Sequence, residues 1–487
     1  MPARRTHLAQ QTPEDDLTAS LANLRDDNGV PSDFPAEVLT EAEAAHAADP
    51  PLDLRDVPFV TLDPADSTDL DQAFHLERAG DGMVLRYAIA DLPGFVTPGG
   101  AIDLEARKRG QTLYLPDGRV PLHPPVISEG KASLLPGEER TAFVWTIAVD
   151  QTGAAAIDGA DVPPARVERA RVRSREKLAY TSAQEAIDAG ASHEQLSLLK
   201  QFGLLRIEQE KLRGGASLNM ADEEIVHDEH GYRIERGFPL EVEEWNAQLS
   251  LLTGMVAARI MLDGGVGILR TMPSPDTEAL EAFRARVAAL GLPWESSVSY
   301  GEFLRELPRN SAHSEAVLHA AASLFRGADY AAFGVSDDEG KTIAAPDSPN
   351  QAAIGAPYAH VTAPLRRLAD RWALVICDAL CAGATVPAWA LETLGEVPRL
   401  MRASSSLAGQ LSAAALDRIE AALLHDRIGD SFTATVLESR EQGAKVLIED
   451  PPITATATGA GLAPGASVTV QVVRADVHTG EIELAAA

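Results

Sequence analysis

The sequence predicts an α+β protein in which one large mixed domain is followed by a small all-β barrel. Residues 49–150 alternate short apolar runs with Gly, Pro and Asp turns, a pattern typical of strands. Residues 240–270, 276–330 and 366–428 carry longer apolar patterns at helical spacing. Residues 429–487 return to short alternating runs. Strands followed by helices within one long stretch indicate an α+β domain.

Residues 1–48 are polar, acidic and rich in alanine. Leu17, Leu21 and Leu24 recur there at the spacing of one helix face. The stretch F-P-A-E-V-L-T-E-A-E-A-A suggests another short helix. We therefore expect a short helical element at residues 1–48, ahead of the large domain at residues 49–428.

Residues 429–487 hold the second group of predicted strands. The runs S-F-T-A-T-V-L-E, A-K-V-L-I-E-D, S-V-T-V-Q-V-V-R-A-D and G-E-I-E-L are separated by Gly and Pro turns. Several short strands in so small a segment suit a barrel of the OB type, with its boundary near Gly429. Phe432 is the only aromatic residue in it, so its surface is expected to be poor for ring stacking.

The composition restricts the class of protein. No run of ~18 apolar residues is present, and the two arginines near the N-terminus are not followed by an apolar segment. We expect neither a membrane span nor a signal peptide, and a cytoplasmic location. The formal net charge of -30 opposes binding to phosphates by the surface as a whole, because such contacts need positive potential.

Basic side chains are nevertheless gathered in residues 165–177, A-R-V-E-R-A-R-V-R-S-R-E-K. In a strand, Arg169, Arg171, Arg173 and Arg175 point to one face. This face is either a solvated charged surface or a local binding surface for phosphates.

Four aspartates, Asp63, Asp66, Asp69 and Asp71, fall within nine residues. Carboxylates at this density repel one another unless they are solvated or share cations. A polar surface turn is the simplest interpretation, because Asp, Ser, Thr and Pro favour turns. An EF-hand Ca²⁺ loop is disfavoured, since the sixth and twelfth positions from Asp63 hold Thr and Phe instead of Gly and Glu. Mg²⁺ fits better, because it takes one or two carboxylates together with substrate phosphate.

Four ordered blocks of sequence resemble the ribonuclease II family. They are D-L-R-D-V-P-F-V-T-L-D-P-A-D-S-T-D-L-D-Q-A-F, Y-A-I-A-D-L-P-G-F-V, A-I-D-L-E-A-R-K-R-G-Q-T-L-Y-L-P-D-G-R-V-P-L-H-P and Y-A-H-V-T-A-P-L-R-R-L-A-D-R, which together cover roughly residues 50–430. The resemblance implies a catalytic domain of RNB type, a mixed β-barrel or sheet that helices wrap around a central RNA channel. It also implies a hydrolytic, processive 3′-to-5′ exoribonuclease that releases nucleoside 5′-monophosphates from single-stranded RNA.

The same resemblance assigns the acidic segment to a two-metal mechanism. Asp63, Asp69 and Asp71 match three of the family's four catalytic aspartates, and Gln72 takes the fourth position. These residues would hold Mg²⁺, or Mn²⁺, and no organic cofactor is implied; a Gln carbonyl can ligate a hard cation but adds no negative charge. Arg366 matches the arginine that would clamp phosphoryl oxygens in the transition state. Its T-A-P-L-R-R block is expected to open a helix, with the threonine near the capping position.

RNA contacts are implied at four further positions. Tyr114 matches an aromatic residue that stacks on a terminal base. Tyr180 and Glu244 match positions around the ribose and phosphates at the cleavage site, with Glu243 as the alternative to Glu244. Arg367 would contact the RNA backbone.

The remaining implied contacts lie along the path of the strand. Arg171 and Arg173 would belong to the basic lining of the channel, and residues 429–487 would bind RNA by charge and shape. The partner is therefore single-stranded RNA, and we expect a monomer.

The sequence also departs from the family pattern. Ile225 takes the position of a second base-clamping ring, and the imidazole of His227 is the nearest ring. Residues 1–48 are too short for the two cold-shock barrels that the family often carries. These departures, together with Gln72, motivate an alternative hypothesis, a non-catalytic RNA-binding protein on the same fold.

Overall fold

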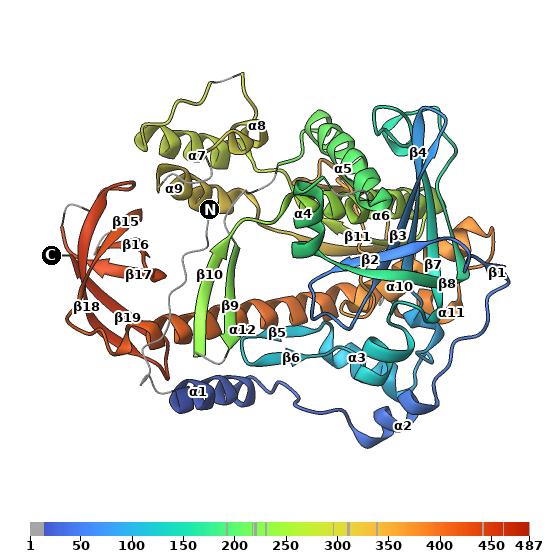
Figure 1. Ribbon diagram of the computed structural model, residues 1–487, viewed down its shortest axis with the longest axis horizontal. Helices are drawn as coiled ribbons and strands as arrows, with labels where there is room; N and C mark the ends of the chain where they lie inside the picture. Colours follow the sequence, from blue (N-terminus) through green and yellow to red (C-terminus); the bar gives the residue numbers. More distant parts are fainter. Residues whose placement is uncertain are drawn as a thin grey trace.

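The large part of the molecule is a mixed sheet wrapped by helices, and the C-terminal part is a closed five-stranded barrel (Figure 1). The predicted α+β class with a C-terminal barrel is therefore confirmed. No helix in the described residues has the length and apolar character that crossing a bilayer requires. The computed structural model describes residues 14–190, 193–216, 218, 222–228, 231–295, 297–308, 312–337, 339–440, 443–460 and 462–486.

The central sheet has the strand order β1-β8-β2-β3-β4-β7, and β8 also pairs with β7. β8 pairs with β7 along residues 166–173 and with β2 along residues 174–179, so five strands close into a ring. One face packs on helices α5, α6 and α10, and the other face packs on α2 and α3. The strands are β1 (Leu52–Asp53), β2 (Phe59–Asp63), β3 (Gln72–Ala79), β4 (Gly82–Ala90), β7 (Glu139–Val149) and β8 (Arg166–Ala179).

Helices cover the sheet where the sequence shows helical spacing. The longest of them on the sheet is α6, whose buried residues include Trp245, Leu249 and Leu252. The helices are α2 (Ala36–Ala44), α3 (Ala101–Arg109), α4 (Tyr180–Asp188), α5 (Glu194–Arg213), α6 (Glu241–Gly264), α7 (Thr277–Ala289), α8 (Tyr300–Arg305), α9 (Ala312–Ala321), α10 (Leu368–Cys381) and α11 (Ala388–Thr393). Short strand pairs are β5 (Leu113–Leu115) with β6 (Gly118–Val120), β9 (Asp222–Asp228) with β10 (Gly231–Gly237), β11 (Gly267–Thr271) with β12 (Asp329–Phe333), and β13 (Asn350–Gln351) with β14 (Ala356–Pro357).

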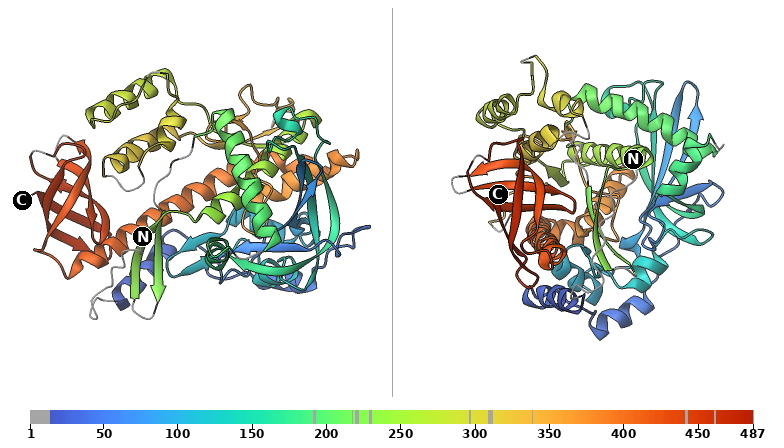
Figure 2. Two further views of the ribbon diagram at one scale, coloured as in Figure 1. Left: turned by 45° about the horizontal axis from the view of Figure 1, so that its top comes forward. Right: turned by 60° about the vertical axis from the view of Figure 1, so that its left-hand side comes forward.

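The C-terminal barrel closes in the order β15-β16-β17-β19-β18. The long helix α12 (Val397–His425) runs from the large part to the barrel (Figures 1 and 2). The predicted boundary near Gly429 falls in the turn between α12 and β15. The barrel strands are β15 (Ser431–Arg440), β16 (Gly443–Glu449), β17 (Pro452–Thr458), β18 (Ser467–Asp476) and β19 (Glu481–Ala486).

Helix α1 (Glu14–Asp27) lies along α12 and the barrel. Leu17, Leu21 and Leu24 are buried there in one core with residues of α12, the barrel and the β5–β6 hairpin. Residues 14–44 thus hold two helices, α1 over the spaced leucines and α2 over the second stretch. Residues 1–13 lie outside the described part of the chain.

Candidate active site

One rim of the closed sheet brings the acidic segment to the end of β8. β2 and β8 run parallel, so Asp63 at the end of β2 lies beside the last residues of β8. β3 begins with Gln72 and runs antiparallel to β2, so the loop of residues 64–71 leaves and re-enters the sheet at this rim. Lys177 of β8 donates from Nζ to two carbonyl oxygens of the loop, at 2.7 and 2.6 Å, which fixes the path of the loop.

The carboxyl groups of two aspartates in this segment, Asp63 and Asp71, lie in partly or fully buried surroundings. Asp71 is 4% exposed, and its Oδ1 accepts a hydrogen bond from the backbone N–H of Leu365 at 2.8 Å. Asp63 is partly buried, and its Oδ2 has no hydrogen-bond partner among the described residues. Burial raises the pKa of Asp63 to about 6 and that of Asp71 to about 8, although the charge of Arg366 opposes the rise. A cation beside these two carboxylates would therefore stabilise their charged forms.

Asp69 is paired with an arginine that the sequence argument did not identify. Arg119 Nη1 lies 2.6 Å from Asp69 Oδ1, and its Nη2 lies 2.8 Å from Glu129 Oε1. Arg119 is the direct cross-strand partner of Tyr114 in the β5–β6 hairpin, so both side chains leave the hairpin on one face. The sequence held a signal for this hairpin in Y-L-P-D-G-R-V, since Asp-Gly between apolar residues predicts a tight hairpin.

The side chain of Gln72 is hydrogen-bonded to a backbone carbonyl and to two hydroxyl groups. Its amide nitrogen donates to the carbonyl of Thr362 at 2.7 Å, and its amide oxygen accepts from the hydroxyls of Tyr87 and Ser250. An ionised aspartate could not donate to the Thr362 carbonyl, so the glutamine links β3 to residues 362–367, the arginine loop, in a way that the family's usual aspartate could not.

The arginine loop differs from the helix start that the sequence predicts. Helix α10 begins at Leu368, whereas residues 364–366 form a turn and Arg367 forms an isolated β-bridge with Gln111. The reason is Asp370, which is fully buried and accepts from the N–H of Ala363 at 2.7 Å while pairing with Arg367 at 2.8 and 2.9 Å. The guanidinium of Arg367 is thus bound within its own turn.

Arg366 instead faces the acidic segment. Its side chain is 46% exposed, and its Nε lies 3.5 Å from Asp71 Oδ2. Its charge acts on both Asp63 and Asp71, so the loop brings a guanidinium to two carboxylates that are eight residues apart in sequence. Such a planar group is suited to bind two oxygens of a phosphate.

Two of the predicted RNA-contacting residues, Tyr114 and Tyr180, are within range of the charges of the acidic segment. Tyr114 is 54% exposed, and the charges of Asp69 and Asp71 act on it. Tyr180 directly follows β8, where burial, followed by the charge of Asp63, raises its pKa to about 12. Its hydroxyl accepts from Asn246 Nδ2 at 3.1 Å.

The two glutamates at the start of α6 have different surroundings. Glu243 Oε1 accepts from the N–H of Leu240 and caps the helix, and its charge also acts on Tyr180. Glu244 is half-buried in the same turn. Ile225 and His227 lie on β9, and their side chains fall outside the described residues.

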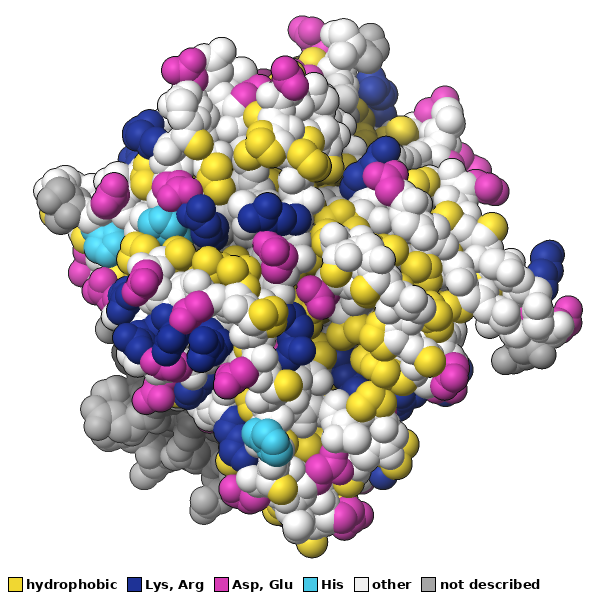
Figure 3. Space-filling view, turned by 90° about the vertical axis from the view of Figure 1, so that its right-hand side faces the viewer, with side chains coloured by type: hydrophobic (Ala, Val, Ile, Leu, Met, Phe, Trp, Pro, Cys, Tyr) yellow, Lys and Arg dark blue, Asp and Glu magenta, His cyan; other side chains and the backbone are white. Residues whose placement is uncertain are grey.

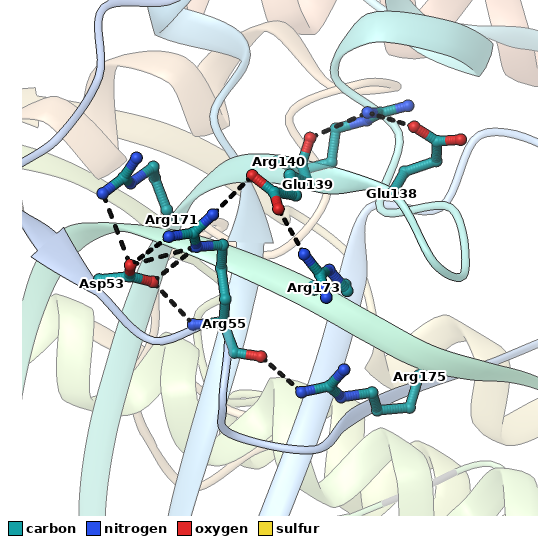
Figure 4. Close-up of polar contacts among 8 residues, drawn as sticks. All are labelled: Asp53, Arg55, Glu138, Glu139, Arg140, Arg171, Arg173 and Arg175. Carbon is teal, nitrogen blue, oxygen red and sulfur yellow. Dashed lines mark hydrogen bonds and ion pairs between the residues drawn. The ribbon is translucent and has the colours of Figure 1, made fainter.

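Arg171 and Arg173 lie farther back along β8. Arg171 pairs with Asp53, and Arg173 pairs with Glu139, while Arg55 contacts both acids (Figure 4). Basic side chains also gather, with acidic ones between them, on the molecular face seen from the right-hand end of Figure 1 (Figure 3). Arg173 precedes Lys177 by four strand residues, or about 13 Å, so these arginines lie outside direct reach of the carboxylates.

The residues present fit a divalent cation on two carboxylates. Among the described residues, Asp63 Oδ2 has no hydrogen-bond partner, and burial raises the pKa values of both Asp63 and Asp71. Mg²⁺ commonly takes one or two carboxylates, with water and substrate phosphate completing its coordination. Within the described residues, no three Asp, Glu, His or Cys side chains form a ready metal group. In the structure Asp69 is paired with Arg119, and the side chain of Gln72 is hydrogen-bonded to Thr362, Tyr87 and Ser250.

Comparisons with known proteins agree with this architecture. The RNB domain model matches residues 52–380, and the RNase II-type exonuclease C-terminal S1 domain model matches residues 430–487. A closed sheet that bears an acidic rim, joined by a long helix to an S1 barrel, defines the class of RNase II-type proteins. The chain belongs to the RNB domain family, whose members are exoribonucleases and some inactive relatives.

Several relatives show how far the similarity extends. Probable exosome complex exonuclease RRP44 of Caenorhabditis elegans is 27% identical over 338 residues, which cover 66% of this chain and 33% of that protein. Inactive exonuclease DIS3L2 of Arabidopsis thaliana is 28% identical over 368 residues, or 68% of this chain and 33% of that protein. Ribonuclease R of Escherichia coli K12 is 30% identical over 268 residues, or 53% of this chain and 32% of that protein. The chain thus spans about a third of the length of these relatives.

The fold itself is shared with a solved structure. The apo form of Mycoplasma genitalium RNase R matches with a TM-score of 0.85 at 19% identity, covering 97% of this chain and 78% of that chain. The same protein has also been solved in complex with ribose-methylated single-stranded RNA.

Proposed function

We propose that this chain is a hydrolytic, processive 3′-to-5′ exoribonuclease that degrades single-stranded RNA to nucleoside 5′-monophosphates. The observation that carries the proposal is the pair of buried carboxylates, Asp63 and Asp71, that face Arg366 at one rim of the sheet. Buried acids with raised pKa values beside an arginine are typical of sites that handle phosphate with a divalent cation. Membership of the RNB domain family supports the same reaction.

Each residue of the rim has a role in this proposal. Asp63 and Asp71 would hold Mg²⁺, or Mn²⁺, and Asp69 would join them once Arg119 releases it. The cation would supply a water nucleophile of lowered pKa and charge for the leaving 3′ oxygen. Arg366 binds the non-bridging oxygens of the scissile phosphate, where charge develops in the transition state.

The surrounding side chains bind and orient the RNA end. Tyr114, which is exposed, stacks on a terminal base. Tyr180 lies within range of the charge of Asp63, and Glu244 lies in the first turn of α6. Both side chains contact the last ribose. Arg171 and Arg173 extend the positive charge along β8 toward the incoming strand, each with an acid partner that RNA phosphates would displace.

Digestion of end-labelled poly(A) tests the proposal. With Mg²⁺ the wild-type chain should release mononucleotides from the 3′ end, and EDTA should stop the release. Asp66 offers a matched control, since it lies in the same loop but is exposed. Asp66→Asn should retain activity, whereas Asp71→Asn should lose it. Mononucleotide release by Asp71→Asn at the wild-type rate would refute the proposal.

A second function, RNA binding without catalysis, has specific support. Gln72 is held by other contacts, Asp69 is paired with Arg119, and one similar protein is an inactive exonuclease. Under this alternative, the chain would bind single-stranded RNA with the same affinity in EDTA and in Mg²⁺ and would release no mononucleotide.

A further inference from the structure

Arg119 connects a candidate metal ligand to an acid outside the metal site. Its Nη1 binds Asp69 Oδ1 at 2.6 Å, while its Nη2 binds Glu129 Oε1 at 2.8 Å and donates to Thr68 Oγ1 at 3.1 Å. Thr68 Oγ1 in turn donates to Glu129 Oε2 at 2.9 Å. The guanidinium therefore has two acid partners, and only Asp69 belongs to the acidic segment that faces Arg366.

The pair of Arg119 and Asp69 is partly shielded from solvent. The side chain of Asp69 is 15% exposed, and that of Arg119 is 30% exposed. Arg119 donates a hydrogen bond to Oδ1 of Asp69, one of the two oxygens of that carboxylate. A divalent cation on Asp69 must therefore either meet the guanidinium at short range or move it.

We propose that Arg119 is a resident counter-ion of Asp69, which a divalent cation displaces onto Glu129, so that this exchange sets the metal affinity of the site. The inference rests on the proposed metal site at Asp63 and Asp71. Glu129 is the acceptor that makes the exchange feasible, because it already binds the other arm of the guanidinium and is itself oriented by Thr68. Arg119 thus acts through Asp69 and is a positioning residue.

The charge balance explains why the effect should be large. Five acids, Asp63, Asp66, Asp69, Asp71 and Glu129, stand against three cations, Lys177, Arg119 and Arg366. Loss of the Arg119 charge would therefore leave the acidic segment still more negative. Phosphates of bound RNA would add the negative charge that favours the cation. Removing a unit charge about 7 Å from a divalent ion improves metal affinity by about tenfold even when the solvent screens it fully.

Two substitutions should change the affinity in opposite directions. Arg119→Gln removes the competing charge, so RNA-free metal binding should tighten by about tenfold or more. Glu129→Gln removes the site to which the guanidinium moves, so Arg119 should remain on Asp69 and metal binding should weaken. A merely structural role for the network would weaken binding in both variants.

The test is a titration of the full chain with Mn²⁺, without RNA, in which electron paramagnetic resonance measures free Mn²⁺. Thermal melting with and without Mg²⁺ gives a second readout. Arg474→Gln is a matched control, because Arg474 also pairs with more than one acid, namely Asp476, Glu481 and Glu483, but on the C-terminal barrel. Its metal affinity should equal that of the wild type.

The outcomes separate this inference from the proposed function. Tighter binding by Arg119→Gln together with weaker binding by Glu129→Gln supports the exchange. Equal or weaker binding by Arg119→Gln overturns it, since the arginine would then orient Asp69 for the metal. If Arg119→Gln melts early, binding by Glu129→Gln that equals or exceeds the wild type overturns the inference by itself. Absence of metal binding in every variant, even with RNA present, overturns the proposed function instead.

Discussion

Replacement of Asp71 by Asn removes one buried negative charge and keeps the shape of the side chain. The Asn oxygen can still accept from the N–H of Leu365, as Oδ1 of Asp71 does. Burial raises the pKa of Asp71 in the folded protein from 3.8 to about 8, so the folded state favours the protonated carboxyl. A carboxyl whose pKa rises on folding contributes full stability only below its unfolded pKa and loses it as pH rises through its folded pKa. Between about pH 4 and pH 8, the metal-free protein should therefore lose stability from this group.

The size of the effect follows from the pKa difference. About four pKa units at 1.36 kcal/mol each give a destabilisation on the order of 5 kcal/mol above pH 8, and less than about 1 kcal/mol at pH 4. The asparagine does not ionise, so the variant avoids this loss. In EDTA at pH 8, Asp71→Asn should unfold at a higher urea concentration than the wild type, and the difference should shrink as pH approaches 4.

Metal addition supplies the second half of the assay. Mg²⁺ at pH 8 should stabilise the wild type, because a ligand that binds the folded state raises its stability, and it should stabilise the variant much less. The variant should bind single-stranded RNA but release no mononucleotides. An Asn variant that is equally or less stable than the wild type at pH 8 would show that this carboxylate is not desolvated as described.

Three further expectations concern the RNA. Arg366→Lys keeps the charge but loses the planar fork, so single-turnover cleavage should slow by roughly 10²-fold or more while RNA affinity changes little; an unchanged rate would remove Arg366 from the transition state. Tyr114→Leu should weaken binding of a short oligonucleotide by about 1–3 kcal/mol in fluorescence anisotropy, whereas an unchanged affinity would place the terminal base elsewhere. Affinity for single-stranded RNA should fall steeply between about 50 and 200 mM salt, and a flat response would argue against a basic path along β8.

Most of the fold follows from patterns that act locally. The leucine spacing in residues 14–27 predicts α1, and the alternation in residues 429–487 predicts the barrel, because burial on one face selects those periods. The helix start near Arg366 is different, since a pattern cannot show that Asp370 is buried and binds the N–H of Ala363. A hydrogen bond from a backbone N–H to a side chain seven residues later here overrides the local signal of a threonine two residues before a proline.

The sequence identified the candidate site only through the family resemblance. How the site departs from the family pattern is visible only in the structure. The resemblance grouped Asp63, Asp71 and Arg366, and in the structure the charge of Arg366 acts on both carboxylates. The sequence could not show that Gln72 would bind the carbonyl of Thr362, a contact between residues 290 positions apart. It contained the hairpin signal for Arg119, but only the three-dimensional structure shows that this arginine meets Asp69.

The most direct test of the central claim uses an RNA in which sulfur replaces one non-bridging oxygen of the terminal scissile phosphate. If a cation on Asp63 and Asp71 contacts that phosphate, cleavage of one stereoisomer in Mg²⁺ should fall by about tenfold or more, and Mn²⁺, which tolerates sulfur better, should restore it. Equal cleavage of the sulfur-substituted and normal RNA in Mg²⁺ with both stereoisomers, or a loss that Mn²⁺ does not restore, would contradict the account.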